Sequence, residues 1–187
     1  MIVSHPRVLD RDNSLLVVID VQESYREVAF EFARVQRAIE RLLGAAGVFG
    51  IPVLATVQYP KGLGQMIPEL SQKLPPGSPV VEKLSLSCCG EPAFVAALGS
   101  AKRRQVVVCG LEAHACVNQT VHDLLARDYQ VHVPQDAISS RFEADFSIGW
   151  SKMIGSGAVP CSVEMACLEW VRTAAVPEFK LVQKLIK

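Results

Sequence analysis

The sequence has no excess of charge of either sign and no long apolar run. Its 187 residues carry 19 Lys and Arg against 19 Asp and Glu, and the basic residues form no block. Since contacts to phosphate drive nucleic-acid binding, we expect no nucleic-acid partner, and ribonuclease activity finds no support. No apolar stretch approaches the roughly 18 residues of a membrane span. The first residues, MIVSHPRVLDRDN, also lack the apolar run of a signal peptide, so we expect no membrane partner.

Cysteines are present, but their spacing is typical of neither a zinc site nor a disulfide framework. There are six, Cys88 and Cys89 are adjacent, and no C-x-x-C pair occurs. Structural zinc is therefore excluded, and we expect neither a metal nor another cofactor. Without a signal peptide, this cysteine usage indicates a reduced compartment. We expect a cytoplasmic protein, with an organelle as the alternative.

Aromatic residues are scarce, at 6%, although half of the residues are hydrophobic. The apolar content is therefore mostly aliphatic, which is typical of strands that are buried on both faces. Short apolar runs predict six strands, at 15–20, 52–58, 80–83, 105–110, 130–134 and 158–163. The segments between and after them predict helices, at 22–47, 91–102, 116–127, 142–155 and, with an interruption at Pro177, 163–187.

This alternation of strands and helices predicts the fold class. Strand–helix repetition of this kind forms a mostly parallel sheet with helices on both faces. We therefore expect an α/β protein with three α-β-α layers and a six-stranded, Rossmann-like sheet. The sequence shows no internal repeat, low-complexity tract or linker, so we expect one domain over residues 1–187.

Three chemically active residues stand at or after the ends of predicted strands. Asp20 ends the first strand, Lys83 ends the third, and Cys116 follows the fourth by six residues and begins a helix. In open parallel sheets, ligands bind beyond the carboxyl ends of the strands, so these side chains are expected to face one crevice. Each has a plainer interpretation: Asp20 as a helix N-cap, Lys83 as a surface lysine and Cys116 as a small core residue.

Together these residue types suit acyl transfer by a thiol. A helix N-terminus and a nearby lysine lower a thiol's pKa, and a carboxylate accepts its proton and later passes it to a leaving group. Backbone N–H groups in the turn before Cys116 have no helical partner and suit an oxyanion. Cys116 would attack a carbonyl, an amine or ammonia would leave, and water would hydrolyse the thioester.

Several segments resemble the isochorismatase-like cysteine hydrolases. LLVVIDVQ, VVEK and VVVCGLEAHACVNQT, with DAISSR downstream, carry the resemblance, which extends from about residue 12 to the end. QYPKGLGQMIPEL and FKLVQKLIK are similar to the branch called isochorismatase domain-containing proteins. By position, Asp20, Lys83 and Cys116 match the family's catalytic residues. The resemblance also implies a cis Leu111–Glu112 peptide and an oxyanion hole made by the N–H groups of Glu112 and Cys116.

The sequence departs from other members of this superfamily at informative places. Nicotinamidases carry an aspartate and histidines for a metal after the second strand, whereas TVQYPKGLG has no carboxylate or histidine. A metal site and nicotinamide specificity are therefore not expected. Isochorismatases proper lack the cysteine and cleave a vinyl ether, so Cys116 argues against that reaction. In the D-x-Q-x-x-Phe pattern Tyr25 takes the last place, which adds a hydroxyl near the pocket.

Five residues are candidates for substrate binding: Gln22, Tyr25, Gln58, Tyr59 and His114. For Gln22 we favour orientation of Asp20 or its loop over substrate contact. His114 either lines the pocket or braces the backbone. Cys88 and Cys89 follow Lys83 closely and are expected near the pocket, where a redox role is the less favoured reading.

These observations predict a cysteine hydrolase of a small amide or related carbonyl compound, acting through a thioester. The second hypothesis is a protein with weak or no catalysis that acts as a binding or scaffold oligomer. In either case we expect a homo-oligomer, such as a dimer, tetramer or octamer. Specificity would depend on the loops at 58–68 and 138–150.

Overall fold

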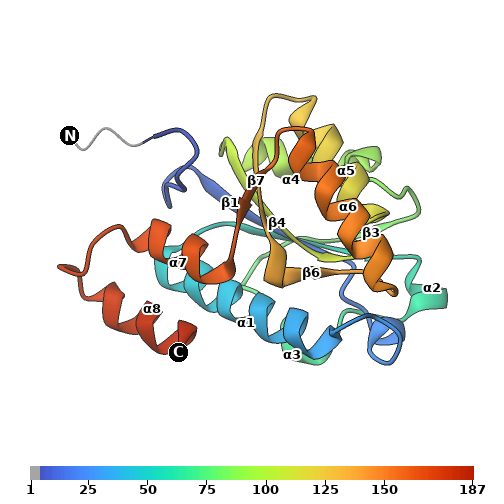
Figure 1. The fold of residues 1–187 in the computed structure, drawn as a ribbon, viewed down its shortest axis with the longest axis horizontal. Coiled ribbons are helices and arrows are strands. Elements are labelled where there is room, and N and C mark those ends of the chain that lie inside the picture. Colours follow the sequence, from blue (N-terminus) through green and yellow to red (C-terminus); the bar gives the residue numbers. More distant parts are fainter. Residues whose placement is uncertain (1–4) are drawn as a thin grey trace.

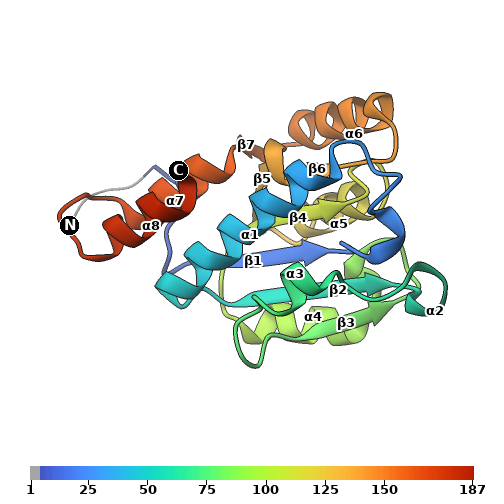
Figure 2. The ribbon, with the colours of Figure 1, turned by 90° about the horizontal axis from the view of Figure 1, so that it is seen from below.

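A computed structural model describes residues 5–187 and shows a central sheet between two layers of helices (Figures 1 and 2). The order of the main strands is β3-β2-β1-β4-β5-β7, and β6 pairs with the end of β4. Every strand pairing of this sheet in the described residues is parallel. The strands are β1 (Ser14–Ile19), β2 (Val53–Gln58), β3 (Val80–Lys83), β4 (Gln105–Leu111), β5 (Gln130–Pro134), β6 (Ile138–Ser139) and β7 (Val159–Cys161). The predicted fold class is confirmed.

The helices divide between the two faces of the sheet. They are α1 (Phe32–Phe49), α2 (Pro60–Leu63), α3 (Pro68–Ser71), α4 (Pro92–Ser100), α5 (Cys116–Leu125), α6 (Glu143–Gly155), α7 (Val163–Val171) and α8 (Glu178–Ile186). Helices α1, α3, α7 and α8 pack on one face, and α4, α5 and α6 on the other (Figure 1). Within residues 5–187 no helix has the length and apolar character needed to cross a membrane.

Alternation along β1 explains how one strand serves both layers. Leu16 and Val18 belong to the apolar cluster beneath α1, whereas Leu15, Val17 and Ile19 belong to the cluster beneath α5. All five are fully buried. A strand at the centre of a three-layer fold must be apolar on both faces, which is why LLVVI is a continuous apolar run.

The first predicted helix begins later than expected. The apolar spacing from Tyr25 predicted a helix over 22–47, but α1 starts at Phe32. The segment before it turns away to dock on the loop after β6, where Phe30 N–H donates to Ser140 O (2.9 Å) and its carbonyl accepts from Ser139 Oγ. A tertiary contact thus overrides the local periodicity. The predicted turn-rich loop after β2 contains the short helices α2 and α3.

Gly110 lies where β4 pairs with the carboxyl end of β1. Gly110 pairs with Ile19 and has a φ of 120°, and a Cβ at this position would lie 2.0 Å from the Ile19 carbonyl oxygen. Only glycine fits here. The sheet order continues to β2 on one side of β1 and to β4 on the other, so the switch point of the sheet lies between β1 and β4. Figure 2 shows the carboxyl ends of β1, β2 and β3 pointing toward α2.

Candidate active site

Asp20 and Lys83 form a buried ion pair at the carboxyl edge of the sheet. Asp20 directly follows β1 and Lys83 ends β3; Oδ2 of Asp20 lies 2.7 Å from Nζ of Lys83. The two residues are 1% and 2% exposed. Asp20 has a φ of 53°, a left-handed conformation in which the chain turns out of the strand. Its second oxygen, Oδ1, accepts a hydrogen bond from the Thr56 hydroxyl (2.7 Å).

Lys83 is surrounded by acceptors that keep it charged. Besides Asp20, its ammonium donates to Gln58 Oε1 and to the carbonyls of Ser85 (3.3 Å) and Leu86 (3.1 Å). Burial acts to lower the pKa of Lys83, but the charge and hydrogen bond of Asp20 outweigh it, and the net shift is upward. Lys83 therefore remains a cation in its buried position.

Cys116 is the first residue of α5 and lies beside this ion pair. It is 5% exposed, its Sγ lies 3.9 Å from Gln58 Oε1, and both Asp20 and Lys83 interact with the thiol. Burial raises the pKa of Cys116 to about 11; the charge of Asp20 acts in the same direction and Lys83 opposes it. Lys83 lowers this pKa, as the sequence predicted, but burial outweighs it and the net shift is upward. At neutral pH Cys116 is therefore a protonated thiol.

In the turn before Cys116, the backbone N–H groups of Glu112 and Cys116 make no hydrogen bond within the described residues, and neither does that of His114. The Leu111–Glu112 peptide is cis, as the resemblance implied. The N–H groups of Ala115 and Val117 donate to the Glu112 carbonyl (3.0 and 3.1 Å), which closes the turn. The amides of Glu112 and Cys116 are the pair expected for an oxyanion.

Neighbouring elements hold this turn from two sides. A Cβ at Gly149 of α6 would lie 2.7 Å from the Ala113 carbonyl oxygen, so α6 packs directly on the turn. The Glu112 carboxylate accepts from Arg141 Nε (2.7 Å). Sequence reasoning did not single out Gly149 or Arg141, because only the fold brings them to residues 112–116.

The five residues predicted to bind substrate occupy different places. Tyr25 is half-buried, and burial together with the charges of Glu112, Cys116 and Asp20 raises its pKa, so its hydroxyl is protonated near the thiol. Gln58 contacts Lys83 and Cys116, and Tyr59 is half exposed at the rim. His114 Nδ1 bonds to Ser140 Oγ (2.9 Å), which favours the brace over the pocket.

Gln22 supports the loop after β1, which is the role that the sequence favoured over substrate contact. It is fully buried, and its amide bonds to the Gln58 N–H (2.8 Å), the Gln58 carbonyl (2.9 Å) and the Gly64 carbonyl (2.6 Å). Both polar atoms of the side-chain amide are therefore engaged within the protein. Gln22 ties the loop after β1 to the end of β2.

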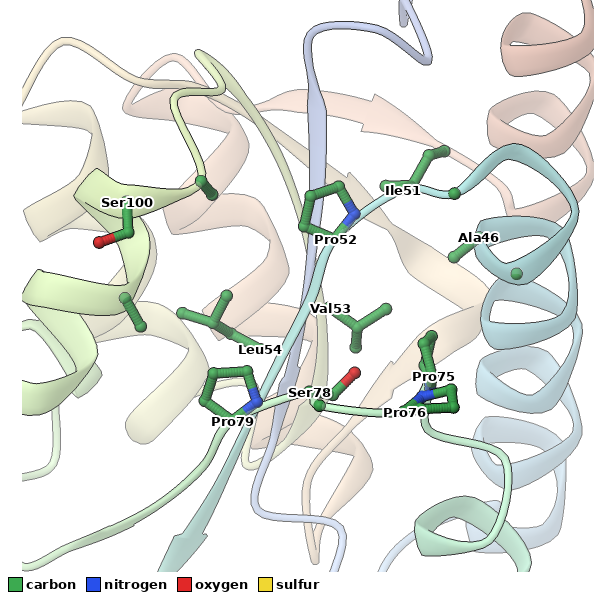
Figure 3. A pocket seen from close by; sticks show the side chains of 15 residues that line it. Ala46, Ile51, Pro52, Val53, Leu54, Pro75, Pro76, Ser78, Pro79 and Ser100 are labelled. Atoms are coloured by element: carbon green, nitrogen blue, oxygen red, sulfur yellow. The ribbon is translucent and has the colours of Figure 1, made fainter.

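Two pockets help to locate the chemistry. One, of about 440 Å³, lies at the carboxyl ends of β2 and β3 and is lined by Tyr59, Lys83 and Leu84, among others. The other, of about 390 Å³, lies at the opposite end of the sheet, where Pro52, Pro79 and the 75–77 turn form its walls (Figure 3). Among the described residues no titratable side chain lines the second pocket, whereas Lys83 lines the first. Asp20 and Cys116 line neither of the two pockets. Within residues 5–187 no group of three or more potential ligands is arranged to hold a metal ion.

Comparisons with known proteins show the family and the fold. The family model described as the isochorismatase domain matches residues 14–165. Isochorismatase domain-containing protein 2 of Danio rerio is 37% identical over 178 residues, which cover 95% of this chain and 89% of the relative. The structure of MAR1 ribonuclease from Caenorhabditis elegans is similar with a TM-score of 0.92 at 38% identity, over 96% of this chain and 92% of that one. The Escherichia coli YcaC product, described as an octameric hydrolase of unknown specificity, has a TM-score of 0.91 at 19% identity, over 98% and 91% of the two chains, which shows the fold alone.

Proposed function

The chain belongs to the isochorismatase-like hydrolase family, and on this premise we propose that it hydrolyses a small amide or related carbonyl compound with Cys116 as the nucleophile. The observation that carries the proposal is the buried Asp20–Lys83 ion pair beside a thiol that begins α5. The free amides of Glu112 and Cys116 complete the set of groups that acyl transfer requires.

Each step of the proposed reaction uses one of these groups. Asp20 takes the proton of the Cys116 thiol as the sulfur attacks the carbonyl carbon, and the two amides bind the developing oxyanion. The C–N bond then breaks, and the amine leaves with the proton that Asp20 held. Water, deprotonated by Asp20, attacks the thioester carbonyl. The C–S bond then breaks, the acid is released, and Asp20 returns the proton to the Cys116 sulfur. Lys83 stabilises the negative charge of Asp20 and of the transient thiolate throughout.

The raised pKa of Cys116 makes the base essential. At neutral pH the thiolate is scarce, so transfer of the proton to Asp20 must accompany attack. Lys83 serves this transfer because it holds the carboxylate in place and in its charged form. A substrate whose leaving group needs a proton, such as an amide, suits this arrangement best.

A second function, as a binding or scaffold protein with weak or no catalysis, is favoured by the burial of the site. Asp20, Lys83 and Cys116 are all at most 5% exposed, which leaves little of these side chains open to a substrate. Ribonuclease activity, which the name of the C. elegans relative suggests, suits this chain less well because its formal net charge is zero.

We also propose that residues 1–187 act as one domain and that the protein is a cytoplasmic homo-oligomer. The octameric state of the E. coli protein supports oligomerisation only as a precedent within this fold. Light scattering on the purified protein tests the oligomeric state, and fractionation of cells that express it tests the cytoplasmic location.

Alkylation of the cysteines by iodoacetamide tests the proposed nucleophile without a known substrate. Because Asp20 rather than water accepts the proton, we expect the rate at Cys116 to be nearly constant between about pH 6 and pH 8. A free thiol with a pKa of about 8.5 loses about tenfold in rate for each unit below that value. Peptide mass spectrometry follows all six cysteines together, and the other five are internal controls.

Two variants separate the hypotheses. Asp20→Asn should convert the plateau at Cys116 into a slope of about tenfold per pH unit. The matched control is Asp123→Asn, a carboxylate of α5 that bonds to Ser87 Oγ and lies outside the ion pair; its plateau should persist. If Cys116 labels no faster than the core residue Cys109 in the wild type, the scaffold function replaces the hydrolase. A confirmed plateau leads to a panel of small amides.

A further inference from the structure

Thr56 places a hydroxyl in the middle of an apolar strand. It lies in β2, within VLATVQ, and is fully buried. A buried hydroxyl is unfavourable unless it is hydrogen-bonded, and here it donates to Oδ1 of Asp20 (2.7 Å). Valine has nearly the same shape and would suit the strand, so the hydroxyl itself is the feature that requires a reason.

The hydrogen bond continues to a second buried thiol. Cys88 Sγ donates to Thr56 Oγ1 (3.8 Å), and Cys88 N–H donates to Thr120 Oγ1 (2.9 Å). All three residues are fully buried. Thr120 lies in α5, four residues after Cys116 and therefore about one turn along the helix. The chain of contacts links the Asp20 carboxylate to the helix that carries the nucleophile.

The direction of these hydrogen bonds determines which proton is donated to the Asp20 carboxylate. A hydroxyl has one proton to donate, and because the Cys88 thiol donates to Thr56, the Thr56 proton is directed to Asp20. Cys88 stays protonated in this role because burial raises its pKa to about 12. Oδ1 of Asp20 is thereby occupied, and Oδ2 is left to face Lys83.

We propose that Thr56 and Cys88 are positioning residues for Asp20. Their hydrogen-bond chain occupies Oδ1, so that Oδ2 is the oxygen left beside Lys83 to take the proton of Cys116, and it supports the charged form of the carboxylate that acts as base. The inference rests on the proposed function, since it concerns how Asp20 takes the proton of Cys116. Neither residue contacts the substrate in this role.

The test measures the alkylation rate of Cys116 against pH in Thr56→Val, which removes the hydroxyl and keeps the shape. We expect the rate at pH 6 to fall about tenfold and the acid limb of the profile to move up by about one pH unit, since the variant loses a hydrogen bond to a charged group. Thr56→Ser, which keeps the hydroxyl, should stay within about twofold of the wild type. Ser14→Ala is the matched control: it removes another buried hydroxyl, which binds Trp170 Nε1 at the start of β1.

The outcomes are distinguishable. If Thr56→Val keeps the wild-type rate and acid limb while Asp20→Asn loses the plateau, the positioning role is wrong and the proposed function stands. If Asp20→Asn keeps the plateau, both fail. Should Thr56→Val not fold, Cys88→Ala gives the same test, with a fall of about threefold expected; a wild-type profile in that variant overturns the inference.

Discussion

His132 is expected to make the fold less stable in acid. It lies in β5, in register with Val107 of β4 and Val159 of β7, and it is fully buried. Neither of its ring nitrogens has a hydrogen-bond partner within residues 5–187. Burial lowers the pKa of His132 from 6.5 to about 4, because the imidazolium would lose its hydration without gaining a partner.

The magnitude follows from the two pKa values. Between pH 6.5 and pH 4 the unfolded chain binds a proton at His132 and the folded chain does not, so the free energy of unfolding falls as the pH falls. The loss attributable to this residue is about 2 kcal/mol at pH 5 and about 3 kcal/mol below pH 4. Above pH 6.5 both states are neutral at His132, and this contribution disappears.

The perturbation is His132→Leu, which removes the titrating group together with its two unpartnered nitrogens. We expect the variant to be more stable than the wild type by about 1–3 kcal/mol at pH 7.5, because no buried polar atoms remain unpaired. At pH 5 the difference should grow by about 2 kcal/mol. Urea unfolding of both proteins at the two pH values measures this difference in the free energy of unfolding. The contributions of the other titrating groups are common to both proteins and cancel in the difference. The same difference at pH 7.5 and pH 5 would refute the reasoning.

Three further predictions concern the site. Cys116→Ala should lower turnover of an amide at least about a thousandfold and leave cooperative unfolding intact; activity near wild type in a steady-state assay would contradict it. Lys83→Met leaves the Asp20 carboxylate buried without its partner, and we expect a loss of about 3–5 kcal/mol in urea unfolding, part of which Asp20→Asn restores in the double variant. Gly110→Ala forces a Cβ into the Ile19 carbonyl and should cost roughly 2–5 kcal/mol. A Gly110→Ala variant with the thermal midpoint of the wild type would contradict this, because it would show that β1 and β4 can move apart at Gly110 without loss of stability.

The strands and the meeting of Asp20 with Lys83 were within reach of sequence reasoning. Each main strand is a short apolar run with its own boundaries, and β3 and β5 have the predicted bounds of 80–83 and 130–134. In a parallel sheet all carboxyl ends lie at one edge, so residues that end different strands converge there. No contact between side chains had to be known in advance.

Other features depend on tertiary packing that local patterns do not record. The start of α1 depends on the docking of Phe30 beside Ser140, which lies over a hundred residues away. The raised pKa of Cys116 depends on how completely the surrounding loops bury the thiol. The sequence shows that Thr56 places a hydroxyl inside an apolar strand. Its hydrogen-bond partner, Asp20, is identified only by the structure, in which β2 pairs with β1.

Trapping the covalent intermediate tests the central claim most directly. The protein would be mixed with p-nitrophenyl acetate, quenched in acid and digested, and the position of the acetyl group would be read by mass spectrometry. The proposed mechanism predicts an acetyl group on Cys116 that hydroxylamine removes, as expected of a thioester, ahead of any label on the other five cysteines. Acetylation confined to surface lysines, with Cys116 unmodified, would contradict Cys116 as the nucleophile.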